Sequence, residues 1–304
     1  MKRIVSVSLG SSKRDSKVET EILGQKILIE RIGTDGNREK AIQLIKELDG
    51  KVAAFGLGGT DLYVQAGNRR YLIREAAGIA KAAVQTPIVD GSGLKNTLER
   101  KVINYLWEQA GINLKGKKVL MVCAMDRFGM AESLEAAGAD VTYGDLVFVL
   151  GLPFPLKSLK ALDRVARLLA PIVCQLPFKY LYPTGDKQDE IKPKNSHYYY
   201  EADIIAGDFH YVKKFLPDSL PGKTIITNTV TKGDVAMLQA RGIDLLITTT
   251  PELNGRSFGT NVMEGLLIAV SGKDPKKIGP KDYEELLDQI GLKPRIQYLG
   301  ATSA

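Results

Sequence analysis

The chain has 304 residues, of which 44% are hydrophobic and 25% charged, with a formal net charge of +7 and a pI near 9.1. This composition excludes a collagen-like or disordered chain, and the length is typical of two domains. The sequence contains no apolar run of the roughly 18 residues that span a membrane, and no basic block with interleaved aromatic residues that would favour nucleic-acid binding. The two cysteines lie far apart in apolar contexts, which favours reduced thiols and a cytoplasmic location.

The first third of the chain alternates strand and helix patterns. The expected strands are Ile4–Ser8, Val18–Leu23, Lys26–Ile32, Val52–Phe55 and Thr86–Val89, and the expected helices are Asn37–Leu48 and Glu75–Val84. Gly24 and Gln25 predict a hairpin between the second and third strands. The glycine run Gly56–Asp61 predicts a tight turn followed by a second hairpin, since no helix opens directly after it.

Two polar stretches follow strands in this part of the chain. In the loop Leu9–Asp15, the cations Lys13 and Arg14 would hold a carboxylate or phosphate, or simply face solvent. Asp90 comes between a strand and a long helix that ends at Gly111. It is therefore either the cap of that helix or an acid–base group.

A βαβ unit follows, with strands Lys118–Val122 and Asp140–Tyr143 around a helix at Met130–Ala137. Its loop resembles a dinucleotide fingerprint, but cysteine and methionine replace the first two glycines. The alternative is an ordinary turn. The candidate cofactor-binding residues of this loop are Cys123, Ala124, Met125, Asp126, Arg127, Phe128 and Gly129.

Asp145 lies just past the second strand of this unit, about 20 residues after the start of the loop, where an acidic side chain binds the ribose hydroxyls of NAD. The same position has no arginine to accept the 2′-phosphate of NADP, so NAD is favoured. Its competing role is the N-cap of a helix that begins at Leu146.

The rest of the chain continues the α/β pattern. The expected helices are Pro155–Leu176, Asp234–Ala240, Val262–Val270 and Pro280–Ile290, the expected strands are Asp203–Ala206, Thr224–Thr227 and Ile243–Thr248, and Lys293–Ala304 reads as a tail. The polar stretch Tyr182–Ser196 has the length of a lid or a disordered loop. Asn254 and Arg256 follow a strand, so they would hold substrate or lie in a surface loop. The two histidines and two cysteines lack the spacing of a metal site, and none is expected.

Three segments carry a family resemblance. Asp90-Gly91-Ser92-Gly93-Leu94, the βαβ unit, and Gly259–Gly265 with its continuation to Pro275 together resemble the shikimate/quinate dehydrogenase family. The resemblance implies a catalytic role for Asp90 and a substrate contact at Glu264, where the family has glutamine. The family's Asn-Val-Thr-x-Pro-x-Lys stretch is absent, and Gly58–Asp61 stands in its place. The nearest lysine to Asp90 in sequence is Lys95, which is the candidate for the second catalytic residue or, alternatively, a solvated residue of the helix.

The family's carboxylate clamp, Ser-x-Ser, is only loosely matched near the amino terminus. The candidate substrate-binding residues are Ser8, Ser11, Ser12, Thr60, Arg256, Asn261 and Glu264. The resemblance implies an α/β fold of two domains, an N-terminal substrate domain over residues 1–98 completed by 268–304, and a Rossmann-type domain with a parallel sheet over 99–267.

We therefore expect an oxidoreductase that uses NAD or NADP on a hydroxyl of a small cyclic hydroxy acid such as quinate or shikimate. The alternative is a non-catalytic or differently catalytic relative that binds a metabolite. The expected partner is a small anionic metabolite rather than nucleic acid or membrane, and the chain is a candidate homodimer.

Overall fold

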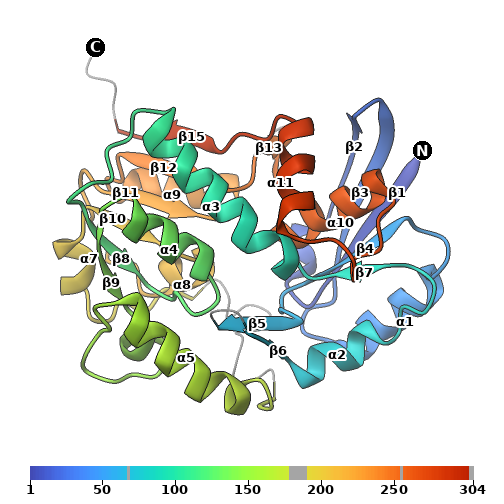
Figure 1. Ribbon diagram of the computed structural model, residues 1–304, viewed down its shortest axis with the longest axis horizontal. Coiled ribbons are helices and arrows are strands. Elements are labelled where there is room, and N and C mark those ends of the chain that lie inside the picture. The colour runs from blue at the N-terminus through green and yellow to red at the C-terminus, as the bar shows by residue number, and fades with distance from the viewer. Residues whose placement is uncertain (67–68, 178–189, 254–255, 301–304) are drawn as a thin grey trace. The chain divides into compact units, whose positions relative to one another are not determined.

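The computed structural model describes residues 1–66, 69–177, 190–253 and 256–300, which fold as two compact units. Unit 1 comprises Met1–Thr97, Leu168–Gln188 and Phe258–Leu292, and unit 2 comprises Leu98–Arg167, Asp189–Ser257 and Lys293–Ala304. Each unit has helices packed on a mostly parallel sheet (Figure 1), so the predicted α/β class is confirmed. Helices α3 (Ser92–Glu108) and α5 (Leu159–Val173) begin in the residues of one unit and end in those of the other.

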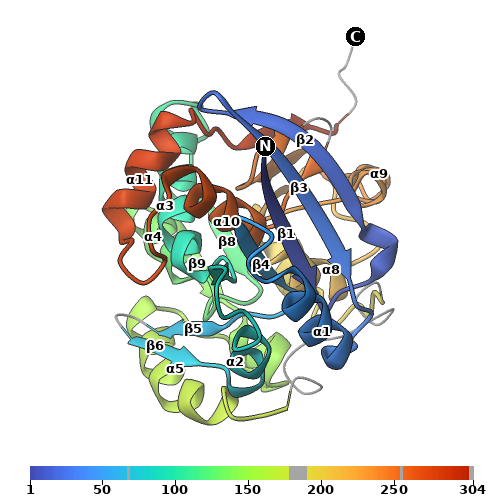
Figure 2. The same ribbon diagram turned by 90° about the vertical axis from the view of Figure 1, so that its right-hand side faces the viewer.

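The sheet of unit 1 has five strands in the order β2-β3-β1-β4-β7 (Figure 2). Its strands are β1 (Lys2–Ser8), β2 (Ser16–Ile22), β3 (Gln25–Gly33), β4 (Ala54–Gly58) and β7 (Ile88–Val89). All pair in parallel except β2, which pairs antiparallel with β3. The predicted hairpin is present, but its two-residue turn is Leu23-Gly24 rather than Gly24-Gln25, and both residues have positive φ, as a type I′ turn requires. The second predicted hairpin forms from β5 (Tyr63–Ala66) and β6 (Arg69–Leu72).

The two faces of this sheet differ because side chains alternate along a strand. Val5, Val7, Phe55 and Leu57 join a buried apolar cluster that includes residues of α1 (Arg38–Leu48) and α2 (Arg74–Ala80). The opposite face carries Ser6, Ser8, Gly56 and Gly58 and packs against α10 (Thr260–Ser271), which is followed by α11 (Pro280–Gln289). A Cβ on Gly56 would lie 3.0 Å from the backbone carbonyl oxygen of Asn261 and 3.0 Å from its side-chain Nδ2, so the small residues allow α10 to approach the sheet closely.

The sheet of unit 2 has six strands in the order β15-β12-β11-β10-β8-β9, and only β15 runs antiparallel. Its strands are β8 (Lys118–Met121), β9 (Asp140–Tyr143), β10 (Ile204–Ala206), β11 (Thr224–Thr227), β12 (Leu245–Thr248) and β15 (Arg295–Tyr298). Its other elements are α4 (Phe128–Ala136), α7 (His197–Glu201), α8 (Phe209–Lys214), α9 (Lys232–Ala240) and the short pair β13 (Glu252–Leu253) and β14 (Arg256–Ser257). Strands β9 and β10 flank β8, so the order reverses between β8 and β10.

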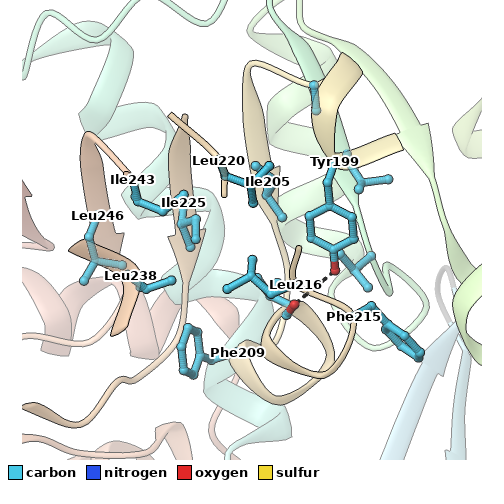
Figure 3. Packing of buried hydrophobic residues seen from close by; sticks show 14 of the residues in the cluster. Tyr199, Ile205, Phe209, Phe215, Leu216, Leu220, Ile225, Leu238, Ile243 and Leu246 are labelled. Atoms are coloured by element: carbon cyan, nitrogen blue, oxygen red, sulfur yellow. Dashed lines mark hydrogen bonds between the residues drawn. The ribbon is translucent and has the colours of Figure 1, made fainter. Parts of the chain in front are cut away.

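The core of unit 2 is aliphatic and aromatic (Figure 3). Ile205, Ile225 and Leu246 come from three adjacent strands, and Phe209 and Phe215 come from α8 and the residue after it. Tyr199 is fully buried, and its hydroxyl donates to the carbonyl oxygen of Val212 at 3.0 Å. Tyr199 therefore packs in the core of unit 2.

Several boundaries differ from the sequence-based expectation. The tail contains β15, which pairs with β12, so this segment belongs to unit 2 and does not complete unit 1. The chain returns to unit 1 at Phe258 rather than at residue 268, because the whole of α10 packs on its sheet. Residues 182–189 of the polar stretch lie outside the described residues. Among the described residues, no helix is both long and apolar enough to cross a membrane.

Candidate functional site

The parallel strands of unit 1 bring several predicted residues to one edge of the sheet. Ser8 ends β1, Gly58 ends β4, and Asp90 directly follows β7. The carboxyl ends of parallel strands lie at the same edge, where α/β sheets bind ligands. The loops after β1 and β4 touch, since a Cβ on Gly59 would lie 2.8 Å from the amide nitrogen of Gly10.

A partly buried ion pair lies at this edge. The Nζ of Lys95, in the first turns of α3, is 3.2 Å from Oδ1 of Asp61, and the two side chains are 9% and 19% exposed. Because removing two charges from water costs desolvation free energy, the pair is a weak source of stability, and we treat it as a candidate for chemistry. Asp61 was not a candidate from sequence. The sequence did point to this loop, because Gly58–Asp61 stands where the resembled family has its lysine stretch. In the same loop, the hydroxyl of Thr60 donates to the Asp61 carbonyl oxygen at 3.2 Å.

Asp90 is a structural neighbour of this pair. One of its oxygens accepts hydrogen bonds from the amides of Leu62 and Tyr63, and the other accepts from the amide (3.0 Å) and hydroxyl (2.7 Å) of Ser92. Burial and then the charge of Asp61 raise the pKa of Asp90. Its carboxylate therefore ties the start of α3, which carries Lys95, to the loop that carries Asp61.

Glu264 is a buried brace in the middle of α10. Its carboxylate accepts from the amide of Gly91 at 2.6 Å and from the hydroxyl of Tyr283 at 2.5 Å. Burial and then the charge of Asp90 raise the pKa of Glu264 to about 7. Both oxygens bond within the protein, and the side chain is only 3% exposed, so the predicted substrate contact at this residue is replaced by a packing role.

The other predicted substrate residues divide between two places. Asn261 donates to Ser6 Oγ at 2.8 Å, against the sheet face. Ser8 Oγ accepts from Arg31 at 3.0 Å, and Ser11 offers its carbonyl oxygen to the same guanidinium. The Ser12 amide donates to Asp35 at 2.7 Å. Arg256 lies in β14 of unit 2, outside this group, and Asn254 lies outside the described residues.

In unit 2, the loop after β8 is folded around Asp145. Oδ1 of Asp145 accepts from the amides of Ala124 at 2.9 Å and Met125 at 2.8 Å, and the residue is 1% exposed. Within the described part of the chain, the second oxygen is buried without a hydrogen-bond partner. Burial raises the pKa of Asp145 to about 6. The expected cap role is corrected, because the π-helical turn at Asp145–Val149 includes Asp145 itself and follows Gly144.

Arg127, the cation of the same loop, contacts three carboxylates. Arg127 is 1% exposed and donates to Glu99 and, at 2.8 Å, to Asp208, and Asp126 lies 3.7 Å from its Nε. Burial alone would lower the pKa of Arg127, but the three carboxylates hold it above its ordinary value. Asn228 in turn donates to Asp208 at 2.8 Å, so the network links the ends of β8, β10 and β11.

The loop fits a dinucleotide at its ribose end. Asp145 has a buried carboxylate oxygen without a hydrogen-bond partner, and helix α4 begins after Arg127 with its N-terminus uncapped by any side chain, both among the described residues. The N-terminus of α4 follows β8, next to the point where the strand order reverses, and Asp145 follows the adjacent edge strand β9, which is the usual arrangement of a nucleotide site in such sheets. The pyrophosphate end is poorer, because Cys123 and Met125 replace the glycines and Arg127 is already held by carboxylates. Phe128 and Gly129 form the buried first turn of α4.

Cysteine and metal chemistry are not prominent at either edge. Burial, together with the charges of Asp145 and Asp126, raises the pKa of Cys123 well above its ordinary value, so this thiol stays protonated. Among the described residues, no three His, Cys, Asp or Glu side chains are grouped so as to hold a metal ion.

The fold and the two polar sheet edges define a two-unit α/β protein. The chain belongs to the family described as "Domain of unknown function (DUF8754)", whose model matches residues 93–299, and residues 3–90 match "Domain of unknown function (DUF8753)". No curated protein matches the sequence. These matches leave the resemblance to shikimate/quinate dehydrogenases as a prediction.

Similar solved structures include binding proteins and dehydrogenases. A galactofuranose binding protein is 13% identical, with 96% of this chain and 99% of that chain covered and a TM-score of 0.36. A putative malic enzyme (malate oxidoreductase) is 13% identical, with 96% and 85% covered and a TM-score of 0.35. L-tryptophan dehydrogenase from Nostoc punctiforme is 11% identical, with 95% and 80% covered and a TM-score of 0.36. Similarity at this level bears on neither substrate nor reaction.

Proposed function

We propose that the chain is an oxidoreductase that acts on a hydroxyl of a small hydroxy acid, with Lys95 and Asp61 as its acid–base pair. The observation that carries the proposal is the partly buried Lys95–Asp61 ion pair at the carboxyl edge of the unit 1 sheet. Oxidation of an alcohol needs a proton acceptor beside the hydroxyl, and a lysine that has released its own proton supplies one.

The residues of unit 1 divide the task as follows. Lys95 is an ammonium group in the ion pair and first releases one proton to solvent; the neutral amine then accepts the hydroxyl proton at Nζ, and the Asp61 carboxylate stabilises the ammonium group that forms again. Asp90 keeps the loop of Asp61 in place through the amides of Leu62 and Tyr63. A nicotinamide dinucleotide, when bound, supplies the hydride acceptor. In unit 2, Asp145 and the N-terminus of α4 are the groups proposed to hold it, which favours NAD over NADP.

A second candidate is a metabolite-binding protein without a dinucleotide. It is favoured by Asp145, whose carboxylate already bonds the loop amides of Ala124 and Met125. Glu99, Asp126 and Asp208 add further negative charge around Arg127, and this charge repels a pyrophosphate.

The test combines cofactor binding with turnover. Calorimetry with NAD and NADP, and turnover of quinate and shikimate, are measured for the natural chain, for Lys95→Met, and for Lys46→Met as an exposed control on α1. We expect NAD to bind and Lys95→Met to lower turnover by about 10²-fold or more with the control unchanged. Hydroxy-acid binding without binding of either dinucleotide would establish the second candidate.

A further inference from the structure

The sheet of unit 1 ends in a long edge strand, β2. Among the described residues, β2 pairs with β3 and with no other strand (Figure 2). It spans seven residues and pairs one to one with β3, without a bulge, a glycine or a proline. The other edge strands of the two main sheets are shorter, since β7 has two residues and β9 and β15 have four each. A long, regular edge strand presents a row of backbone groups with which another strand can pair.

The hairpin geometry shows which backbone groups of β2 face this edge. Its two-residue turn closes on Ile22 and Gln25, which form a hydrogen-bonded pair in a hairpin of this kind. Hydrogen-bonded and non-hydrogen-bonded pairs alternate along an antiparallel ladder. The even-numbered residues of β2 therefore bond to β3 through their backbone groups, whereas the odd-numbered residues direct their N–H and C=O groups to the outer edge.

The charged side chains of β2 are arranged so that the strand complements itself. Lys17 and Glu19 are both exposed and lie on one face of the sheet, two residues apart. Lys17 is 3.1 Å from Glu30 of β3, with 63% of its side chain exposed. A second copy of β2, antiparallel and centred on Val18, would place its Glu19 opposite Lys17 and its Lys17 opposite Glu19. Each lysine would then lie between two carboxylates, Glu30 of its own chain and Glu19 of the second copy.

Like charges disfavour the neighbouring registers. Pairing centred on Lys17 or on Glu19 would place that residue opposite itself, and pairing centred on Thr20 would bring two glutamates together. In the register centred on Val18, the other face of the sheet brings Val18 against its own copy, beside the buried Ile29 of each chain. Charged residues on an edge usually prevent strand pairing, so this pattern excludes other strands and accepts a second copy of itself.

We propose that β2 pairs with β2 of a second copy of this chain, in the register centred on Val18, and that the chain thereby forms a symmetric dimer through the edge of unit 1. The like-charged pair of this register, Asp15 with Glu21, falls at its two ends, and Asp15 lies outside β2 in an ion pair with Arg31. Main-chain hydrogen bonds supply the affinity of such an added strand, and the side chains supply its specificity. The dimer does not depend on the reaction proposed above.

Sedimentation equilibrium over a range of protein concentrations tests the pairing. We expect the natural chain to form a reversible dimer with twice the 33.2 kDa mass of one chain. Lys17→Glu and Glu19→Lys each create two like-charged pairs, so each should raise the dimer dissociation constant by about tenfold or more. The double variant restores opposite charges and should return the constant to within about threefold of the natural value. Lys26→Glu, an exposed residue of β3 away from the outer edge, is the matched control and should leave it unchanged.

Amide hydrogen exchange of the natural chain tests the register without any substitution. We expect the amide protons of Lys17 and Glu19 to exchange more slowly at concentrations at which the dimer forms, whereas that of Val18, already bonded to β3, should not change. A monomer at every concentration would overturn the proposal. A dimer that Lys17→Glu and Glu19→Lys leave intact, or that the double variant fails to restore while Lys26→Glu has no effect, would also overturn it.

Discussion

The two units place a buried cation among carboxylates at the same kind of sheet edge, yet the two cations differ in what they can do. Lys95 in unit 1 bonds to Asp61, and an amine can release its proton when its surroundings change. Arg127 in unit 2 is held by Glu99, Asp126 and Asp208, and a guanidinium keeps its charge in proteins. The comparison teaches that burial and charge alone do not mark an acid–base site. Unit 1 has a cation suited to proton transfer, whereas the cation of unit 2 suits a permanent cross-link of the loops.

The largest expected effect on stability comes from replacing Arg127. Arg127→Met leaves three carboxylates near a buried centre, so we expect a loss of about 3–5 kcal/mol in the free energy of unfolding, measured by urea denaturation. Arg167→Met is the control, because that arginine pairs with Asp163 on the exposed surface of α5 and should cost less than about 1 kcal/mol. A loss at Arg127 no greater than that of the control would show that the network is not structural.

The pH dependence of stability tests Glu264 separately from the Lys95–Asp61 pair. The pKa of Glu264 is about 7 in the folded chain against an ordinary 4.5, so the folded state holds the proton more tightly. The resulting stabilisation, of up to about 3 kcal/mol, is fully present below pH 4.5 and is lost as the pH rises to about 7. Glu264→Gln, which stays neutral, should flatten this slope in thermal melts across the window, whereas Glu47→Gln on the surface of α1 should not. An unchanged slope would remove Glu264 as its source.

Asp90 tests whether a residue can matter for turnover without touching the substrate. Asp90→Asn places an amide donor against the N–H groups of Leu62 and Tyr63 or against the N–H of Ser92, so it should cost about 1–3 kcal/mol of stability. It should also lower turnover by about 10²-fold, because the loop of Asp61 shifts. Asp49→Asn is the control, since Asp49 also accepts backbone amides, those of residues 84–86, away from this edge. Full activity of the folded Asp90→Asn protein would reduce Asp90 to a helix cap.

The smallest effect is expected at Asp145. Asparagine can still accept the amides of Ala124 and Met125, so Asp145→Asn should change the melting temperature little. Removal of the charge should narrow the preference for NAD over NADP, by about tenfold or less in the ratio of dissociation constants. Asp140→Asn, exposed on the neighbouring strand, should leave the ratio unchanged. Equal affinity for both dinucleotides in the natural chain would contradict the role assigned to Asp145.

Local patterns predicted much of the fold, and tertiary pairing decided the rest. The strand pattern at Ile4–Ser8 and the turn residues near Gly24 placed β1 and the β2–β3 hairpin to within a few residues, because both signals are local. Strand β15 was missed because Arg295–Tyr298 is short and mostly polar, and only its pairing with β12 makes it a strand.

The candidate site followed the same rule. Asp90 and Lys95 were found because both lie beside a recognisable helix start. Asp61 was not, since it acts through Lys95, a partner far away in sequence. Glu264 was assigned to substrate by resemblance, but its buried bonds to Gly91 and Tyr283 depend on helix packing that no local pattern reveals.

A double-mutant cycle on turnover tests the acid–base pair most directly. Quinate or shikimate oxidation is measured for the natural chain, Lys95→Met, Asp61→Asn and the double variant, with Lys46→Met as the exposed control. If Lys95 and Asp61 act as one unit, Lys95→Met lowers turnover by about 10²-fold or more, and adding Asp61→Asn lowers it no further. Independent effects that multiply in the double variant, or a Lys95→Met protein as active as Lys46→Met, would contradict the account.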